Sequence, residues 1–191
     1  MRNWNKPYLA GLGIFCGAMV LSLPRRGTTS GTILLAVAIV AALIVVITFV
    51  LQRRLCSVVD NARAHRPDAV VIPAYTTGEM IDLGLSVGAS VQGWMAQGGN
   101  PIAVAVSQEQ IELWSGREAE PRWVVLRSAI QEIDLFTGVY GARGIDVIGV
   151  RAAAGGLLFV PAYQPLRNMG GSDVRGLQRA LAELGGPVRV P

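Results

Sequence analysis

The first 51 residues contain two long apolar stretches, of which the second is the longer. Residues 32–51 carry no charge over twenty positions, and fourteen of these are Ile, Leu, Val or Phe. A helix rises about 1.5 Å per residue, so this stretch spans roughly 30 Å, the thickness of a bilayer's hydrocarbon core. We therefore predict a transmembrane helix over residues 32–51.

The first apolar stretch, residues 7–23, has seventeen residues and includes three glycines. Arg2 and Lys6 precede it, as in a secretory signal peptide, which is the alternative interpretation. However, Arg25 and Arg26 follow the stretch almost at once and are unfavourable at a cleavage site. We predict a retained transmembrane helix over residues 7–23.

Small residues recur at a four-residue spacing in both stretches. Gly13 and Gly17 form one such pair, and Ala38 and Ala42 form another. This spacing allows the backbones of two helices to approach closely, and it predicts that the two helices pack as a hairpin. The alternative is that glycine and alanine are simply common in this chain.

Basic residues near the ends of the two stretches predict their orientation. Six lie on the side of the termini and two lie in the loop between the stretches, and the side richer in Lys and Arg is expected to be cytoplasmic. The six are Arg2, Lys6, Arg53, Arg54, Arg63 and Arg66, and the two are Arg25 and Arg26. We expect a multi-pass protein of the cell membrane with both termini in the cytoplasm.

The helical pattern continues beyond the membrane segment. Apolar residues recur at helical spacing from Leu55 to Ala62, and Pro67 ends the pattern, which predicts a juxtamembrane stalk over residues 52–66. Aromatic and basic side chains at the ends of apolar helices favour the membrane interface. The expected interface residues are Trp4, Tyr8, Arg53 and Arg54.

Residues 67–100 carry a mixed pattern. Residues 69–75 form a short β-branched run, and Thr76 with Glu79 has the spacing of a capping box at the start of a helix. We predict a strand followed by a helix, although alternating apolar residues from Ile81 to Val87 would also suit a strand. Turn residues at 97–101 then predict a linker before the next domain.

The remainder, residues 101–191, predicts closely spaced strands and one final helix. Turn residues separate the strands, as in an antiparallel meander. The helix has Ser172 as its expected cap and presents one apolar face through Val174, Leu177, Leu181 and Leu184. The expected strands cover residues 102–107, 110–115, 123–127, 130–136, 145–152 and 157–162. The fold class is α+β, and residues 67–191 are expected to fold alone.

The order of these elements resembles the PH-like and GRAM-type domains of bacterial membrane proteins. The resemblance covers the hairpin VAVSQEQIELWSG, the stretch VVLRSAIQEI, the hairpin IDVIGVRAAAGGLLFVPA and the closing amphipathic helix. It implies a strongly bent antiparallel sheet within residues 101–191, closed by the C-terminal helix. Ser107 stands at the polar turn of the first hairpin, and Ile130 and Ile133 follow the third strand, as in that family.

Composition narrows the classes of function. Hydrophobic residues make up 51% of the chain and charged residues only 16%, which agrees with partial burial in lipid. The net charge of +4 is spread along the chain rather than gathered in a stripe, so nucleic acid is not expected as a partner. Cys16 and Cys56 provide no disulfide framework, and Cys56 is either a buried apolar residue or an acylation site.

Residue types that carry catalysis or hold metals are sparse. His65 is the single histidine, without cysteines or carboxylates at ligand spacing around it, and it would be the sole possible base for Ser-His-Asp catalysis. We therefore expect no enzyme activity, metal or cofactor. Gly138, Gly141, Gly144 and Arg143 could form a phosphate cradle, but a flexible hairpin loop is the favoured alternative.

Function is expected to lie in binding. Lipid-binding PH domains place basic residues near the first hairpin, whereas this chain has acidic ones there, including Glu109, Glu112 and Glu118. We predict a membrane-anchored module that binds a protein or self-associates; the alternative is a lipid-sensing module that uses its membrane-facing basic residues. An apolar patch around Trp94 and Met95, or an open strand edge, would favour protein binding.

Overall fold

The computed structural model describes residues 28–141, 143–153, 155–164 and 173–189. The chain divides into two compact units, Met1–Arg53 and Arg54–Pro191. Helix α2 (Thr28–His65) begins in the first unit and ends in the second. The expected helix 7–23, with Trp4, Tyr8, Gly13 and Gly17, lies outside the described residues.

Helix α2 is one unbroken helix because residues 32–66 contain neither proline nor glycine, and Pro67 follows its end. The expected stalk over residues 52–66 is thus the end of helix α2 itself, with Arg66 directly after it. Within the described residues this helix alone is long and apolar enough to cross a membrane, over Val37–His65. Its large exposed apolar side chains are Leu35, Val37, Ile39, Val40, Leu43, Ile44, Val46, Ile47, Phe49 and Val50.

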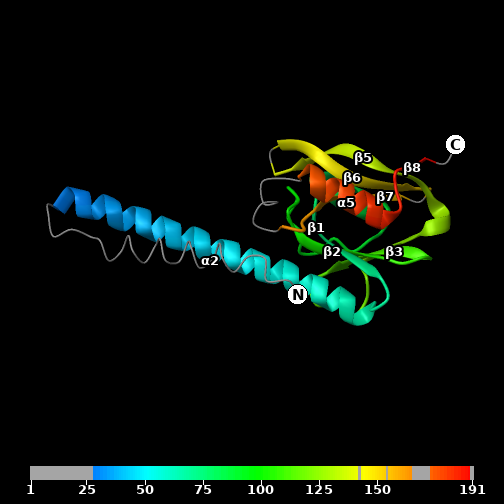
Figure 1. Ribbon diagram of the computed structural model, residues 1–191, viewed down its shortest axis with the longest axis horizontal. Coiled ribbons are helices and arrows are strands. Elements are labelled where there is room, and N and C mark those ends of the chain that lie inside the picture. Colours follow the sequence, from blue (N-terminus) through cyan, green and yellow to red (C-terminus); the bar gives the residue numbers. More distant parts are fainter. Residues whose placement is uncertain (1–27, 142, 154, 165–172, 190–191) are drawn as a thin grey trace. The chain divides into compact units, whose positions relative to one another are not determined.

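The second unit is built on one curled antiparallel sheet (Figure 1). Its strand order is β4-β3-β2-β1-β7-β6-β5-β8. The strands are β1 (Val70–Thr76), β2 (Pro101–Val106), β3 (Gln110–Ser115), β4 (Trp123–Leu126), β5 (Ile130–Tyr140), β6 (Arg143–Ala152), β7 (Gly155–Pro161) and β8 (Val188–Arg189), and a 3₁₀ turn η1 (Arg127–Ala129) links β4 to β5. The predicted α+β class and curled antiparallel sheet are confirmed.

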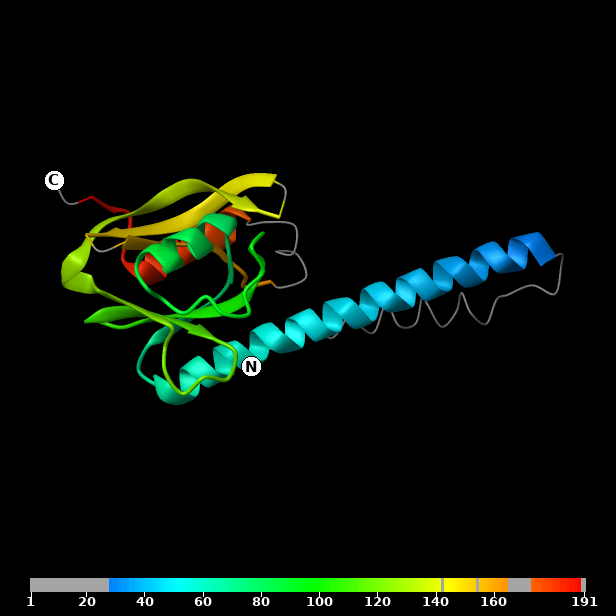
Figure 2. The ribbon, with the colours of Figure 1, turned by 180° about the vertical axis from the view of Figure 1, so that it is seen from behind.

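Two helices cover the concave face of the sheet, α3 (Gly78–Ser86) and α5 (Val174–Leu184) (Figure 2). Leu177 and Leu184 of α5 and Met80 of α3 are buried there with apolar side chains from seven of the strands. Asp173, rather than the expected Ser172, caps α5: its Oδ1 accepts a hydrogen bond from Gly176 N–H at 2.7 Å. Ser172 lies outside the described residues.

The opposite, convex face is covered by the last turns of α2. Leu55, Val58, Val59 and Ala62 are buried against side chains of β1, β2, β3, β6 and β7. These four positions recur at helical spacing, so one stripe of the helix faces the sheet. The end of α2 is therefore a structural layer of the second unit.

The region between residues 67 and 100 belongs to the sheet. β1 lies at its centre, between β2 and β7, and α3 follows it. The expected order of strand and helix is confirmed, and the alternative strand from Ile81 to Val87 is wrong. The cap of α3 is Thr77, whose Oγ1 accepts from Met80 N–H at 3.2 Å, and not Thr76. The expected division at residue 100 does not separate two compact units, because β1 pairs with β2 across it.

Candidate interaction surface

The edge of the sheet formed by β4 is open and apolar. Among the described residues β4 pairs with β3 alone. Trp123 and Val125 point into the inner core, whereas Val124 and Leu126 are 43% and 54% exposed. Residues two apart lie on the same face of a strand, so the two exposed side chains stand next to each other on the outer side of this edge.

The backbone N–H groups of these two β4 residues also point away from the sheet. Arg127 N–H donates to Glu109 O at 2.8 Å, which marks a hydrogen-bonded pair in the register of β3 and β4. Such pairs alternate along an antiparallel ladder, so Val125 bonds to β3 while Val124 and Leu126 direct their N–H groups away from it. Exposed N–H groups beside apolar side chains are what an added strand requires.

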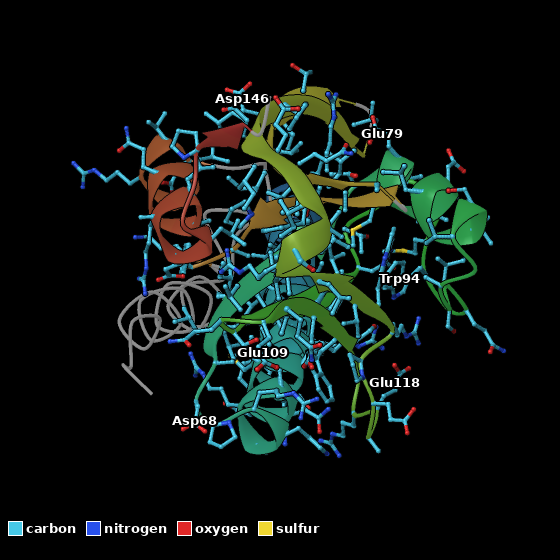
Figure 3. All side chains as sticks on the ribbon, turned by 90° about the vertical axis from the view of Figure 1, so that its right-hand side faces the viewer. Asp68, Glu79, Trp94, Glu109, Glu118 and Asp146 are labelled. Atoms are coloured by element: carbon cyan, nitrogen blue, oxygen red, sulfur yellow. The ribbon has the colours of Figure 1, made fainter. Side chains whose placement is uncertain are left out.

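The other long edge, on β5, is protected. β8 covers only two of its residues. Beyond them, Leu135 N–H donates to Asp134 Oδ1 at 2.8 Å, and Val139 N–H donates to both carboxylate oxygens of Glu79 at 2.8 and 3.0 Å. Figure 3 shows Glu79 beside the β5–β6 hairpin. Carboxylates that occupy edge N–H groups oppose the addition of another strand, so β4 is the better candidate.

Glu112 does not have the exposed position that the sequence suggested. Its side chain is 2% exposed and accepts hydrogen bonds from Arg66 Nε at 2.9 Å to each oxygen and from Trp114 Nε1 at 3.0 Å. Gln110 donates to it as well. Hydrogen bonding to this carboxylate raises the pKa of the Arg66 guanidinium. Glu112 therefore fastens the residue after α2 to β3, and its charge is not presented to a ligand.

The remaining acidic residues near the first hairpin are partly neutralised. Glu118 forms an ion pair with Arg122, while Glu109 and Glu120 are exposed. Figure 3 shows Glu109 and Glu118 on the β3 side of the sheet. Ser107 holds the predicted turn, because its Oγ accepts from Gln110 N–H at 3.1 Å. Glu109 in this turn and Glu120 in the loop between β3 and β4 are thus the exposed carboxylates of this region, and their charge opposes phosphate binding.

The expected apolar patch around Trp94 and Met95 is present only in part. Trp94 is half-buried, and its Nε1 donates to Ser115 Oγ at 3.0 Å. The guanidinium of Arg122 lies over the Trp94 ring, 5.3 Å from its centroid. Met95 is 56% exposed. Trp94 is therefore a fixed part of the fold, and Met95 is the member of the pair that solvent reaches.

The glycines considered as a phosphate cradle do not form a loop. Gly138 is buried in β5 and Gly144 lies in β6, where it pairs with Val139. Gly141 alone is in the turn, with a φ of 64°. Because two of the three glycines are in paired strands, the backbone cannot gather their N–H groups around an anion.

The single histidine has structural contacts. The His65 ring stacks on Trp114 with centroids 5.1 Å apart, and its Nδ1 is 2.9 Å from Asn61 O. Over the described ranges, no group of three or more His, Cys, Asp or Glu side chains could hold a metal ion. Cys56 is a half-buried free thiol.

The residues predicted at the membrane are described only in part. Arg53 and Arg54 are exposed on α2, Ala38 is buried and Ala42 is exposed. Their roles at the interface and in helix packing stay predictions, since the partner residues Trp4, Tyr8, Gly13 and Gly17 fall outside the described ranges.

Three tyrosines of the second unit have raised pKa values. Burial is the main cause at Tyr75, Tyr140 and Tyr163. Tyr163 also donates a hydrogen bond to Glu183 at 2.5 Å, which stabilises its protonated form further. All three shifts move the phenols away from neutral pH, so these groups are poor acids or bases under physiological conditions.

Comparison of the chain with protein-family models, with curated proteins and with solved structures gives no match. The class of this protein is therefore defined by its fold alone. It is an α+β protein with a long apolar helix followed by a curled antiparallel sheet and a C-terminal helix on its concave face.

Proposed function

We propose that this chain is a membrane-anchored, non-enzymatic interaction module whose PH-like domain binds an extended segment of another protein at the open edge of β4. The observation that carries the proposal is the pair Val124 and Leu126, exposed on an edge whose N–H groups face outward. A bound strand would gain backbone hydrogen bonds and apolar side-chain contacts together. The protected edge of β5 leaves β4 as the favoured site.

We further propose that the anchor is multi-pass, with α2 as one span and residues 7–23 as the other, and that the domain is cytoplasmic. The excess of Lys and Arg on the side of the termini supports this orientation. Short edge strands bind weakly on their own, but a membrane anchor confines the domain near membrane-bound partners and so raises their effective concentration.

Peripheral lipid sensing is the second candidate, favoured by the exposed arginines 53, 54 and 63 on α2. Each could add about 1 kcal/mol of attraction to an anionic leaflet. The acidic turn at Glu109 opposes the lipid-binding mode of PH domains, so we rank this function below protein binding. Salt-sensitive binding of the domain to anionic vesicles would reverse this order.

The test of strand addition uses the full chain and Val124→Pro. Proline is tolerated where an edge N–H faces solvent, so the domain should remain folded while one hydrogen bond to an added strand is lost. A photoreactive residue in place of Leu126 should then crosslink to a partner in the parent chain and at least about tenfold less in Val124→Pro. A photoreactive residue in place of Val174, exposed on α5, is the control. Equal crosslinking from positions 126 and 174 would exclude the β4 edge as the binding site. Crosslinking from position 126 that is not reduced in Val124→Pro would exclude it as well.

A further inference from the structure

A polar stripe runs along the last turns of α2, beside the apolar stripe that faces the sheet. Ser57, Asn61 and His65 recur at a spacing of four residues, so they share one face of the helix, and Arg66 follows directly. We call these four residues the polar stripe. Its contacts all involve the hairpin that β3 and β4 form.

The first half of the polar stripe contacts the loop between β3 and β4. Ser57 Oγ accepts a hydrogen bond from Arg117 Nε at 3.1 Å, and Asn61 Nδ2 donates to the backbone oxygen of Glu118 at 2.7 Å. Asn61 is half-buried, so water competes less for its hydrogen bond than at a fully exposed site. These two bonds hold the loop through which the chain enters β4.

The second half of the polar stripe contacts β3 itself. The His65 ring stacks on Trp114, and Arg66 binds the buried carboxylate of Glu112. Glu112 pairs directly with Val124 in the register of β3 and β4. The end of α2 is therefore joined to the one strand that holds the open edge in the sheet.

The open edge depends on this hairpin for its position. Among the described residues β4 pairs with β3 alone, and it is four residues long. On the other side of the loop, Arg122 donates to the Glu118 carboxylate and to the carbonyl oxygen of Gln92, each at 2.8 Å. Asn61 and Arg122 thus hold Glu118 by its backbone and by its side chain. A short strand with one partner opens locally at a low cost in free energy, so each such contact affects its order.

We propose that the polar stripe couples α2 to the binding edge, with Ser57 and Asn61 as the residues that position β4. The proposal rests on the proposed function, because it concerns the edge where a partner strand is added. A β4 that is already ordered loses less conformational entropy when it binds a strand. Coupling between two sites is reciprocal, so a strand bound at β4 in turn stabilises the docked end of α2. Binding at the edge is thereby transmitted to the anchor helix.

The first test is hydrogen exchange of the full chain in detergent, measured on its peptides by mass spectrometry. In the double variant Ser57→Ala, Asn61→Ala, a peptide over β4 should exchange about tenfold faster than in the parent chain, because two hydrogen bonds to the hairpin are lost. A peptide over β6, which these bonds do not reach, should exchange at the parent rate. Asp60→Ala, at an exposed position beside Asn61, is the control and should leave both peptides unchanged.

The second test repeats the photocrosslinking from position 126 in native membranes. The double variant should form about tenfold less crosslink than the parent chain, and Asp60→Ala should form the same amount. Equal acceleration of the β4 and β6 peptides would show a general loss of stability and overturn the proposal. Exchange of β4 at the parent rate, or an undiminished crosslink, would overturn it as well. Absence of any crosslink from position 126 in the parent chain would instead contradict the proposed function, while the exchange of β4 still decides whether α2 positions the edge.

Discussion

Single residues decide how the end of α2 is joined to the sheet. The carboxylate of Glu112 is buried, while its main partner Arg66 is partly exposed. Removing the partner of a buried charge costs more than replacing both members, because the remaining charge is left without compensation. This asymmetry gives a prediction that separates a fastening pair from an ordinary surface ion pair.

Arg66→Ala should lower the free energy of unfolding by about 2–3 kcal/mol. This loss is smaller than for a fully buried ion pair, because solvent already reaches Arg66. The double variant Arg66→Ala, Glu112→Gln should recover more than half of this loss, because no buried charge remains. Chemical unfolding of the full chain in detergent measures both effects. Arg179→Ala, which removes the exposed partner of Glu183, is the control and should cost less than about 1 kcal/mol, because Glu183 keeps its hydrogen bond from Tyr163. Equal effects of Arg66→Ala and Arg179→Ala would contradict a fastening role for Glu112.

Gly149 illustrates how close packing restricts a strand position. A Cβ there would lie 2.1 Å from Cδ2 of Phe136, whose ring is itself stacked under Arg151 at 4.3 Å. Gly149→Ala should therefore destabilise the domain by about 1–3 kcal/mol. The matched control is Gly144→Ala on the same strand, where the nearest atom is 3.7 Å away and little change is expected. Similar melting temperatures for the two variants would show that Phe136 moves aside freely.

At the scale of elements, α5 is held by a narrow apolar stripe. Leu177 and Leu184 are buried, whereas Leu181 is half-buried, and Val174, predicted on the same face, is exposed. Leu184→Ala should cost about 2–5 kcal/mol of stability, the range for a buried leucine, and Leu181→Ala should cost less. Thermal unfolding, monitored by circular dichroism, shows which of the two variants loses more stability. A larger loss for Leu181 than for Leu184 would contradict this packing.

Three tyrosines make the stability of the second unit depend on pH at alkaline values. An unfolded tyrosine ionises near pH 10, whereas Tyr75, Tyr140 and Tyr163 keep their protons longer in the folded domain because their pKa values are raised. Stability should thus be unaffected below about pH 10 and fall as the pH rises further. Tyr75→Phe should make this fall less steep. Melting temperatures between pH 8 and 11 test the prediction, and tyrosinate absorbance at pH 10 from a folded domain would contradict it.

Most helices and strands could be predicted from the sequence, but the pairing of the strands in the sheet could not. Turn residues separate β2 to β7, and the expected strands there are confirmed. β1 was expected in a linker region because its second partner, β7, lies some eighty residues away, and local patterns carry no information on such pairing. The open edge of β4 and the burial of Glu112 depend on strand order and on Arg66, so neither can be seen in an alternating strand pattern alone.

At the scale of the whole second unit, the convex face of the sheet explains which residues the domain requires. Without α2, the apolar side chains of Val71, Tyr75, Trp114 and Val160 would face water. Sequence patterns alone suggested that residues 67–191 fold independently, because they combine strands of alternating apolar residues with a capped C-terminal helix. The structure instead assigns the boundary to Arg54.

The last prediction compares these two fragments. Leu55, Val58 and Val59 of α2 are buried, and burial of each such side chain contributes about 1.5–3 kcal/mol. Their loss is comparable with the whole stability of a domain, about 5–15 kcal/mol. The fragment 54–191 should unfold cooperatively, whereas 67–191 should melt at a much lower temperature, or aggregate through its exposed convex face. Leu55→Asp in fragment 54–191 should reproduce this loss, while Arg63→Asp, at an exposed position on the same helix, should not. Equal melting temperatures for the two fragments would show that α2 adds nothing to the stability of the sheet.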